Sequence, residues 1–194
     1  MRSLHFDKLL CPPTHGDCNP MNEDSTLHPL LMTHRKPGVV DWIGIRRERL
    51  TPPESVESVV AHPDTGLEGD HYAGRPGGKR QVTLIQGEHL EAVASILGVD
   101  AIAPQLVRRN IVVRGINLQA LRDRRFRIGE AVLEFSGDCH PCSRMEENLG
   151  SGGYNAMRGH GGILARVLEA GSISIGDRVE MITMQQQHAD AGRL

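Results

Sequence analysis

The stretch Phe126–Phe135, FRIGEAVLEF, is the part of the chain that decides the fold. Apolar residues alternate along it with polar or charged ones, which is the period-two pattern of a half-buried β-strand. Other short segments are also rich in β-branched and apolar residues: Val39–Ile45, Glu54–Val60, Gln81–Ile85 and Arg108–Val113. We therefore expect short strands to dominate the chain.

Helical periodicity is confined to a few places. Gln86–Leu97, QGEHLEAVASIL, has apolar residues at helical spacing and is followed by Gly98, a helix stop. Met145–Leu149 predicts a second, short helix, whereas Ile163–Glu169 fits either a helix or a strand. Ser172–Ile182 predicts a closing pair of strands. Because helices and strands do not alternate regularly, the pattern predicts a mainly β (α+β) fold, a barrel or folded sheet with a few inserted helices.

Length and composition bound the class of protein. The chain has 194 residues, enough for one domain with a substantial core. A net charge of -2 and 3% aromatic residues argue against a nucleic-acid binder. No apolar run approaches the ~20 residues of a membrane helix, and no signal peptide is evident. With only four cysteines, the chain is expected to be cytoplasmic, without a nucleic-acid or membrane partner.

The first residues differ in composition from the rest. CPPTHGDCNPMNEDSTLHP (11–29) is rich in Pro, Asn, Asp, Ser and Thr and has no periodicity. We predict a poorly ordered N-terminal tail over 1–37, a folded domain over 38–184 and a C-terminal tail over 185–194. Cys11 and Cys18 match no common zinc-binding spacing, so we interpret them as incidental.

The segment GDCHPCSRMEENLG (137–150) contains a C-x-x-C pair, Cys139 and Cys142. A zinc site would need further ligands, for which His71, His140 or His160 are candidates. A thioredoxin-type redox pair would open a helix within a βαβ unit, and that context is missing. An inert, buried cysteine is the remaining alternative to a working thiol.

The residues after the pair favour Cys142 over Cys139. Ser143 and Glu146 have the spacing of a capping box, which predicts a helix that begins directly after Cys142. A thiol at a helix start, near the added charge of Arg144, tends toward the thiolate. Such a thiolate is a soft metal ligand, a nucleophile or a persulfide carrier.

Three further segments are candidates for ligand binding. The glycine-rich stretch 66–80 does not match a phosphate loop, because Arg80 stands where Ser or Thr is required. Its backbone N–H groups and its arginines could still bind an anion. Arg108-Arg109-Asn110 carries groups that hold phosphate and read a heterocycle, or else forms a solvated strand end. A second glycine-rich stretch, 150–162, holds polar side chains unlike those of a passive linker: Tyr154, Asn155, Arg158 and His160.

These segments together resemble one family. Six of them are similar, in this order, to the motifs of the MOSC domain family, which is named for the C-terminal domain of molybdenum cofactor sulfurases. The six segments are GLEGDHYAG (66–74), RQVTLIQGEHL (80–90), RRNIVVRGINL (108–118), FRIGEAVLE (126–134), CHPCSRMEE (139–147) and GYNAMRGHGGI (153–163). The resemblance covers about Gly38 to Met184. It implies a MOSC-type β-barrel that binds the molybdenum cofactor, a pterin dithiolene with a phosphate.

The resemblance also implies roles for individual residues. Cys142 matches the family's hallmark cysteine, a molybdenum ligand in amidoxime-reducing relatives and a suggested sulfur carrier in sulfurases. The cofactor-binding positions implied or suggested by the motifs are Asp70, Arg80, Arg109, Asn110, Asn155, Arg158 and His160.

The chain is similar to the short stand-alone bacterial type, some of which act on N-hydroxylated bases. We therefore expect an oxidoreductase that reduces small N-hydroxylated compounds. No flavin, haem or iron–sulfur motif is evident, so a separate reductase would supply the electrons. The alternatives are a carrier of cofactor or of a Cys142 persulfide and, less favoured, a thiol redox protein. Pyridoxal phosphate is not expected in this chain. Formation of a homodimer is left as an open alternative.

Overall fold

The computed structural model describes residues 26–72 and 74–182. The chain divides into two units, Met1–Thr33 and His34–Leu194. The described part of the first unit contains helix α1 (His28–Leu31), which lies within the predicted N-terminal tail. Cys11, Cys18 and the predicted C-terminal tail lie outside the described residues. In the part of the chain that is described, no helix is both long and apolar enough to cross a membrane.

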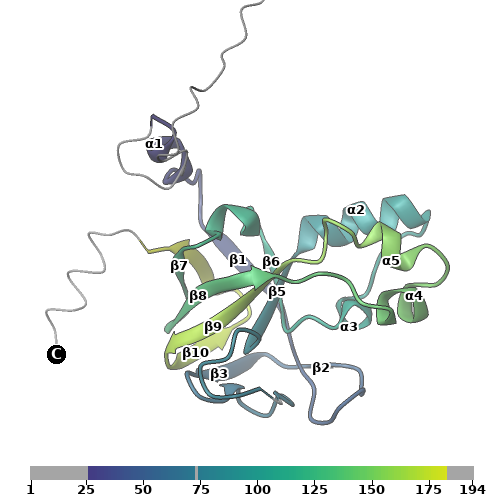
Figure 1. Cartoon of the computed structure of the whole chain (residues 1–194), viewed down its shortest axis with the longest axis horizontal. Coiled ribbons are helices and arrows are strands. Elements are labelled where there is room, and N and C mark those ends of the chain that lie inside the picture. Colours follow the sequence, from purple (N-terminus) through teal and green to yellow (C-terminus); the bar gives the residue numbers. More distant parts are fainter. Residues whose placement is uncertain (1–25, 73, 183–194) are drawn as a thin grey trace, which may run out of the picture. The chain divides into compact units, whose positions relative to one another are not determined.

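The second unit is built around a closed barrel of strands (Figure 1). Neighbouring strands around it follow the order β11-β7-β8-β9-β5-β6-β1, and β1 pairs again with β11 to close the sheet. The mainly β prediction is therefore confirmed. The strands are β1 (Gly38–Ile45), β5 (Val82–Gln86), β6 (Ile111–Arg114), β7 (Arg125–Ile128), β8 (Ala131–Asp138), β9 (Ile163–Glu169) and β11 (Arg178–Met181).

Smaller strands extend this framework. Strand β2 (Glu54–Ser55) pairs with the end of β1. A separate sheet has the order β10-β3-β4, formed by β10 (Gly171–Ser174), β3 (Ser58–His62) and β4 (Gly66–Leu67). The segment 54–60 thus forms parts of two strands instead of one. The predicted closing pair is also wrong, because β10 pairs with β3 whereas β11 pairs with β7 and β1.

The stretch 126–135 forms most of a hairpin. Its strands β7 and β8 are antiparallel, and the chain turns at Gly129, whose φ of 55° suits a residue without a Cβ. Phe126 lies opposite Leu133, and both side chains are fully buried. Burial of one such side chain stabilises the fold by about 1.5–3 kcal/mol, so the alternating pattern fixes which face of the hairpin turns inward.

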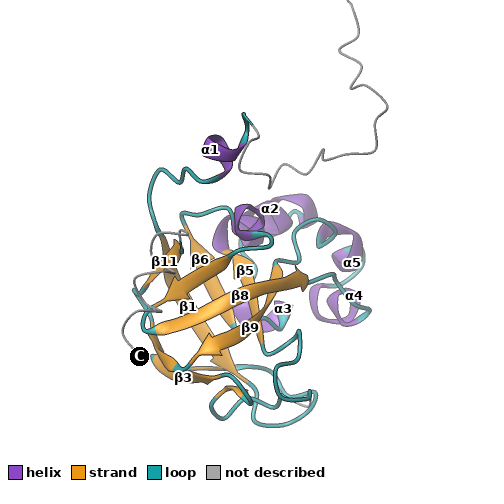
Figure 2. Cartoon of the chain, turned by 60° about the vertical axis from the view of Figure 1, so that its left-hand side comes forward, coloured by secondary structure: helices purple, strands orange, loops and turns teal. Residues whose placement is uncertain are grey.

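Strands β5 and β6 are parallel neighbours, and their connection contains two helices. A parallel connection needs a crossover segment, here α2 (Gly87–Leu97) and α3 (Pro104–Val107). Helix α2 ends at Gly98, which has a left-handed φ of 69°, as the sequence predicts. Figure 2 shows α2 with α4 (Arg144–Leu149) and α5 (Gly153–Ala156) at one side of the barrel.

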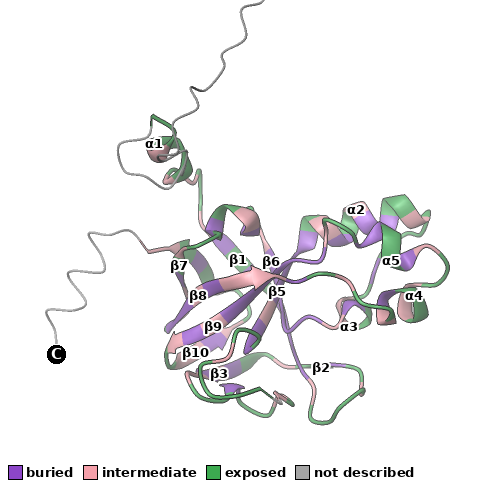
Figure 3. Ribbon diagram, viewed as in Figure 1, coloured by how far each residue is buried: buried purple, intermediate pink, exposed green. Residues whose placement is uncertain are grey.

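Two hydrophobic clusters hold the unit together, and Figure 3 shows the inward-facing parts of the strands as buried. One cluster fills the barrel and includes Ile43, Leu84 and Phe126. The other packs the helices against the barrel's outer face: Trp42, Ile85, Leu90, Val93, Ala94, Ile102, Val107, Val112, Met145, Ala156 and Met157. The helices that follow the cysteines are therefore anchored through Met145 and Met157.

Candidate functional site

The two cysteines lie where strand β8 ends and the chain leaves the barrel. Cys139 extends the β8–β9 pairing, since its N–H donates to the carbonyl of Gly162 at 2.9 Å. Both cysteines are free thiols, but Cys139 is buried and Cys142 is exposed. Burial raises the pKa of Cys139, although the positive charges of Arg109 and Arg80 oppose the shift. Cys139 is therefore held as a neutral thiol, and Cys142 is the accessible one.

Helix α4 begins directly after Cys142, as predicted, with Ser143 at the N-cap. The predicted capping box is wrong, because the Ser143 side chain makes no capping hydrogen bond. The Glu146 carboxylate instead accepts hydrogen bonds from the N–H groups of Gly152 at 2.8 Å and Tyr154 at 2.9 Å. Glu146 thus satisfies the free donors at the start of α5, a helix that the sequence did not predict.

Arg109 is buried, and its guanidinium joins three separate segments. Its Nε donates to the carbonyl of Gly161 at 2.8 Å, and its Nη1 donates to that of Val107 at 2.7 Å. Its Nη2 donates to the carbonyl of Cys139 at 3.3 Å. These contacts fix the cysteine segment against the second glycine-rich stretch. These bonds use three of the five N–H donors of the guanidinium.

Asn110 is also buried, and its side-chain amide forms hydrogen bonds to two neighbouring strands. Its Oδ1 accepts from the hydroxyl of Thr83 at 2.7 Å and from the Thr83 N–H at 3.1 Å. Its Nδ2 donates to the carbonyl of Gly44 at 3.3 Å. Asn110 thereby ties β5 to β1 at the end of the barrel where the cysteines lie.

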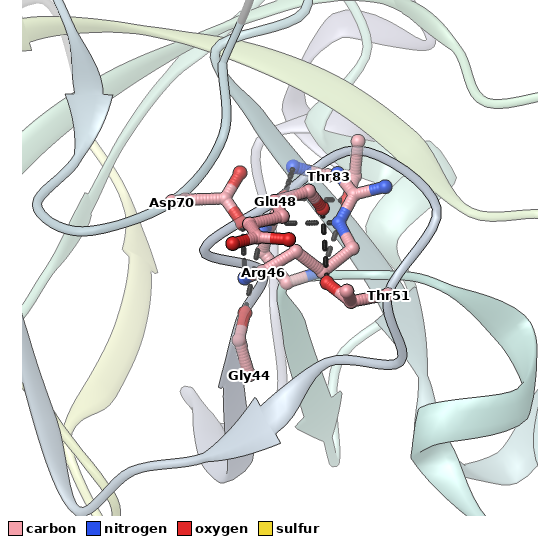
Figure 4. A network of polar contacts seen from close by, with 7 residues as sticks. Gly44, Arg46, Glu48, Thr51, Asp70 and Thr83 are labelled. Atoms are coloured by element: carbon pink, nitrogen blue, oxygen red, sulfur yellow. Dashed lines mark hydrogen bonds and ion pairs between the residues drawn. The ribbon is translucent and has the colours of Figure 1, made fainter.

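Asp70 lies beside Arg46, the residue that follows the end of β1, and Figure 4 shows the Asp70 carboxylate next to Arg46. The Asp70 Oδ1 accepts from the Arg46 N–H at 2.6 Å and lies 3.8 Å from the Arg46 Nε. Only 3% of the Asp70 side chain is exposed. Asp70 is therefore placed to orient Arg46, and the contacts seen in the structure make it a support of the site.

A basic cluster lies within electrostatic range of the C-x-x-C segment, and we define it as Arg46, Arg80 and Arg108. Burial lowers the pKa of Arg108, the nearby guanidinium of Arg46 lowers it further, and Cys142 acts in the opposite direction. Arg80 is exposed and acts electrostatically on Cys139. Within residues 26–72 and 74–182, Arg80 and Arg108 form no ion pair. The cluster therefore carries positive charge that an anionic ligand would neutralise.

Sequence reasoning overlooked Arg46, because it opens the charged run Arg46-Arg47-Glu48-Arg49, in which no single arginine stands out as a ligand. Arg108 was noted within the RRN motif but not chosen. It is the C-cap of helix α3 and has a left-handed φ of 59°. Only the tertiary structure brings these residues within electrostatic range of the cysteine segment.

The second glycine-rich stretch lies close to the cysteine segment because it lacks side chains at critical points. A Cβ on Gly161 would lie 2.0 Å from the carbonyl oxygen of Cys139. The polar residues of the stretch do not converge: Asn155 and Arg158 are exposed. His160 instead packs edge-on against His89 of α2, with ring centroids 4.9 Å apart.

A pocket of about 290 Å³ opens beside the cysteine segment. Its walls come from the turn after β6, the end of β8 and the second glycine-rich stretch. Cys142 does not line it, nor does any residue of the basic cluster. The lining residues are Gln119, Arg122, Asp138, Cys139, His140, Pro141, Gly159, Gly161 and Gly162.

No three His, Cys, Asp or Glu side chains come together as a metal site in the described part of the chain. Within these residues, the zinc interpretation of the C-x-x-C pair therefore lacks its remaining ligands.

Comparison with known families gives one match, to the MOSC domain, over residues 67–180. This span contains Asp70, Arg109 and both cysteines of the C-x-x-C pair. The chain belongs to the MOSC domain family. The resemblance noted in the sequence is thus confirmed.

Several solved structures share the fold of this chain. The YuaD protein from Bacillus subtilis aligns with a TM-score of 0.65 at 20% identity, covering 76% of this chain and 97% of that one. YiiM from Escherichia coli aligns with a TM-score of 0.60 at 21% identity, covering 82% and 79%. YiiM from Geobacillus stearothermophilus gives 0.60 at 16%, covering 76% of each chain. A comparison with curated proteins found no match.

Proposed function

We propose that this MOSC protein binds the molybdenum cofactor and reduces small N-hydroxylated compounds, with Cys142 as the thiolate ligand of molybdenum. The observation that carries the proposal is the exposed thiol of Cys142 within electrostatic range of Arg108, a guanidinium group that has no ion pair among the described residues. Molybdenum favours a soft sulfur donor, and the pterin phosphate requires cationic partners. The donor set fits both needs.

The chain's own residues would divide the work of binding. Arg80 and Arg108 present unpaired positive charge to the phosphate, and Arg46 adds to it from the position that Asp70 fixes. Arg109 and Asn110 hold the surrounding backbone. Asn155 and Arg158, which are exposed, would contact the cofactor only at its outer edge.

The proposed reaction is reductive cleavage of an N–O bond. The substrate R₂N–OH takes up two electrons and two protons and yields R₂NH and water. When bound, the cofactor supplies the two-electron chemistry, and a separate cytoplasmic reductase replaces the electrons. The protein's residues bind the anionic cofactor, orient the Cys142 sulfur and hold Cys139 as a neutral thiol that does not compete for the metal.

One alternative deserves the same experiment, because an exposed free thiol also suits transfer of sulfur between proteins. The protein is purified from cells that make the cofactor and is analysed for molybdenum, for persulfide on Cys142 and for turnover of an N-hydroxylated compound with a chemical reductant. Molybdenum with turnover supports the oxidoreductase. Molybdenum without turnover under any reductant favours a cofactor carrier, and a Cys142 persulfide without molybdenum favours sulfur transfer.

A further inference from the structure

Two histidines join helix α2 to the second glycine-rich stretch. The rings of His89 and His160 meet edge-on, with their centroids 4.9 Å apart and their planes at 80°. Each ring buries its Nδ1, and neither Nδ1 has a hydrogen-bond partner among the described residues. A neutral imidazole can keep its proton on Nε2 and needs no acceptor at Nδ1. The contact therefore suits two neutral rings.

Protonation of either ring makes this contact unfavourable. An imidazolium carries a proton on both ring nitrogens, so its Nδ1–H would be buried without an acceptor. Protonation of both rings would also place two positive charges within 4.9 Å of each other. Water can satisfy the new N–H groups only when the rings separate. Mild acid therefore favours a form in which His89 and His160 have moved apart.

The charges around the pair do not remove this penalty. Burial lowers the pKa of His89 most, and His160 lowers it further. The adjacent Glu88 of α2 acts in the opposite direction but does not reverse the shift. Both closed rings therefore stay neutral until the pH falls below the ordinary histidine value of 6.5.

The elements packed against α2 do not supply a counter-charge either. Arg114 of β6 forms ion pairs with two carboxylates of its own. Strand β5 has no ionisable side chain, and α5 has only Tyr154, which is neutral at these pH values. Arg158 of the glycine-rich stretch is exposed, and its positive charge cannot favour an imidazolium.

His160 is directly connected to the backbone that holds the cysteine segment. The carbonyl of Gly161 accepts the hydrogen bond of the Arg109 Nε at 2.8 Å, and that of Gly162 accepts the Cys139 N–H at 2.9 Å. Gly162 has a left-handed φ of 86°, a conformation that leaves the backbone free to rotate at a residue without a Cβ. Separation of the two rings therefore shifts the acceptors on which the cysteine segment depends.

We propose that the contact between His89 and His160 is a pH-sensitive switch: it holds the second glycine-rich stretch against the cysteine segment at neutral pH, and protonation in mild acid releases both. The release is local, because Met157 at the start of this turn stays buried in the cluster that packs the helices. The switch is a property of the chain itself and does not depend on the molybdenum cofactor.

Hydrogen exchange, followed by NMR on the full chain, tests the switch. The protection factor of the Cys139 amide, which corrects for the intrinsic pH dependence of exchange, is measured at pH 7.5 and 5.5, with and without about 1 M urea. Val40, whose N–H donates to the Asp177 carbonyl at 2.9 Å, is the internal reference for global unfolding. The double variant His89→Phe/His160→Phe keeps two rings and removes both titrations. His62→Phe, at a half-buried position of β3, is the matched control.

We expect the protection factor of Cys139 to fall by up to about tenfold between pH 7.5 and 5.5, as one proton-linked opening requires. Urea should hardly change it, because a local opening exposes little surface. Val40 should be more strongly protected and should lose protection in urea. The double variant should change by less than about twofold with pH, whereas His62→Phe should behave as the parent does.

Three results would overturn the proposal. The first is a Cys139 protection factor that does not depend on pH, and the second is an undiminished dependence in the double variant. The third is equal protection of Cys139 and Val40 with an equal response to urea, because exchange would then report global unfolding alone.

Discussion

The Nε of Arg109 donates a hydrogen bond at 2.8 Å to the carbonyl of Gly161, and the two residues lie 52 positions apart in the chain. With its contacts to Val107 and Cys139, this bond makes Arg109 the link between helix α3, the cysteine segment and the second glycine-rich stretch. The geometry of the candidate site thus depends on a buried cation whose partners are backbone carbonyls.

Replacement of Arg109 should therefore destabilise the fold. Arg109→Leu leaves three buried carbonyls without their donor, and we expect the free energy of unfolding in urea to fall by about 3 kcal/mol. Arg80→Leu is the matched control, because Arg80 is exposed, and should change it by less than about 0.5 kcal/mol. Equal losses in the two variants would show that Arg109 is not a structural link.

Ionisation of the Glu146 carboxylate should change the hydrogen bonds at the start of helix α5. Hydrogen bonds from the N–H groups of Tyr154 and Gly152 lower the pKa of Glu146. The native state therefore favours the ionised form, and the stabilisation that these bonds provide is lost as pH falls below the ordinary value of 4.5. In amide NMR spectra, the Gly152 and Tyr154 signals should titrate with a midpoint below that value.

Glu146→Gln removes the titrating group and should abolish this shared titration. Glu147→Gln, whose carboxylate pairs with Arg144, should leave it intact. A midpoint at or above the ordinary value in the parent protein would contradict the contacts of Glu146.

The contact between His89 and His160 predicts a loss of stability in mild acid. Burial lowers the pKa of His89, and the neighbouring His160 lowers it further, whereas Glu88 raises it. The unfolded chain takes up a proton near the ordinary value of 6.5 before the native state does, so stability falls as pH drops through that value.

His89→Phe keeps a ring at this position and removes the titration. Urea unfolding at pH 7 and pH 5 should show a smaller difference in this variant than in the parent. His71→Asn, at an exposed position, should retain the parent's difference. If His89→Phe retains it as well, the histidine contact does not contribute.

The two thiols of the C-x-x-C pair should differ in reactivity. Cys142 is exposed, whereas Cys139 is buried and its pKa is raised. Iodoacetamide should alkylate Cys142 at least about a hundredfold faster than Cys139, as measured by peptide mass spectrometry on the native protein. Comparable rates would mean that the pair does not have the asymmetry described here.

The elements of the barrel were predictable from local pattern, because alternation and β-branched residues specify buried strand faces. The helix over 87–97 and its stop at Gly98 follow from spacing and a left-handed glycine. Pairing was not predictable: Ser172–Ile182 has the pattern of a hairpin, yet its strands join different sheets. Helix α5 was not predicted, because it lies within a glycine-rich stretch that has no helical pattern. In addition, the N–H groups at its start are bound by Glu146 of helix α4 and not by a capping residue of its own.

The site was predictable only in part. The asymmetry between Cys139 and Cys142 follows from the local helix start, whereas the environment of Cys142 depends on residues distant in the chain. Asn110 has the appearance of a ligand-reading side chain in the sequence, but its amide joins strands. Arg46 carries no sequence signal and reaches the site because Asp70 fixes the end of β1.

Molybdenum content in the parent protein and in Cys142→Ser tests the central claim most directly. Both proteins are purified in parallel from cofactor-producing cells, with Cys139→Ser as the matched control, and their metal content is measured by elemental analysis. We predict molybdenum in the parent, partial retention in Cys139→Ser and near-complete loss in Cys142→Ser. Equal molybdenum in the parent and in Cys142→Ser would contradict the assignment of Cys142 as the metal ligand.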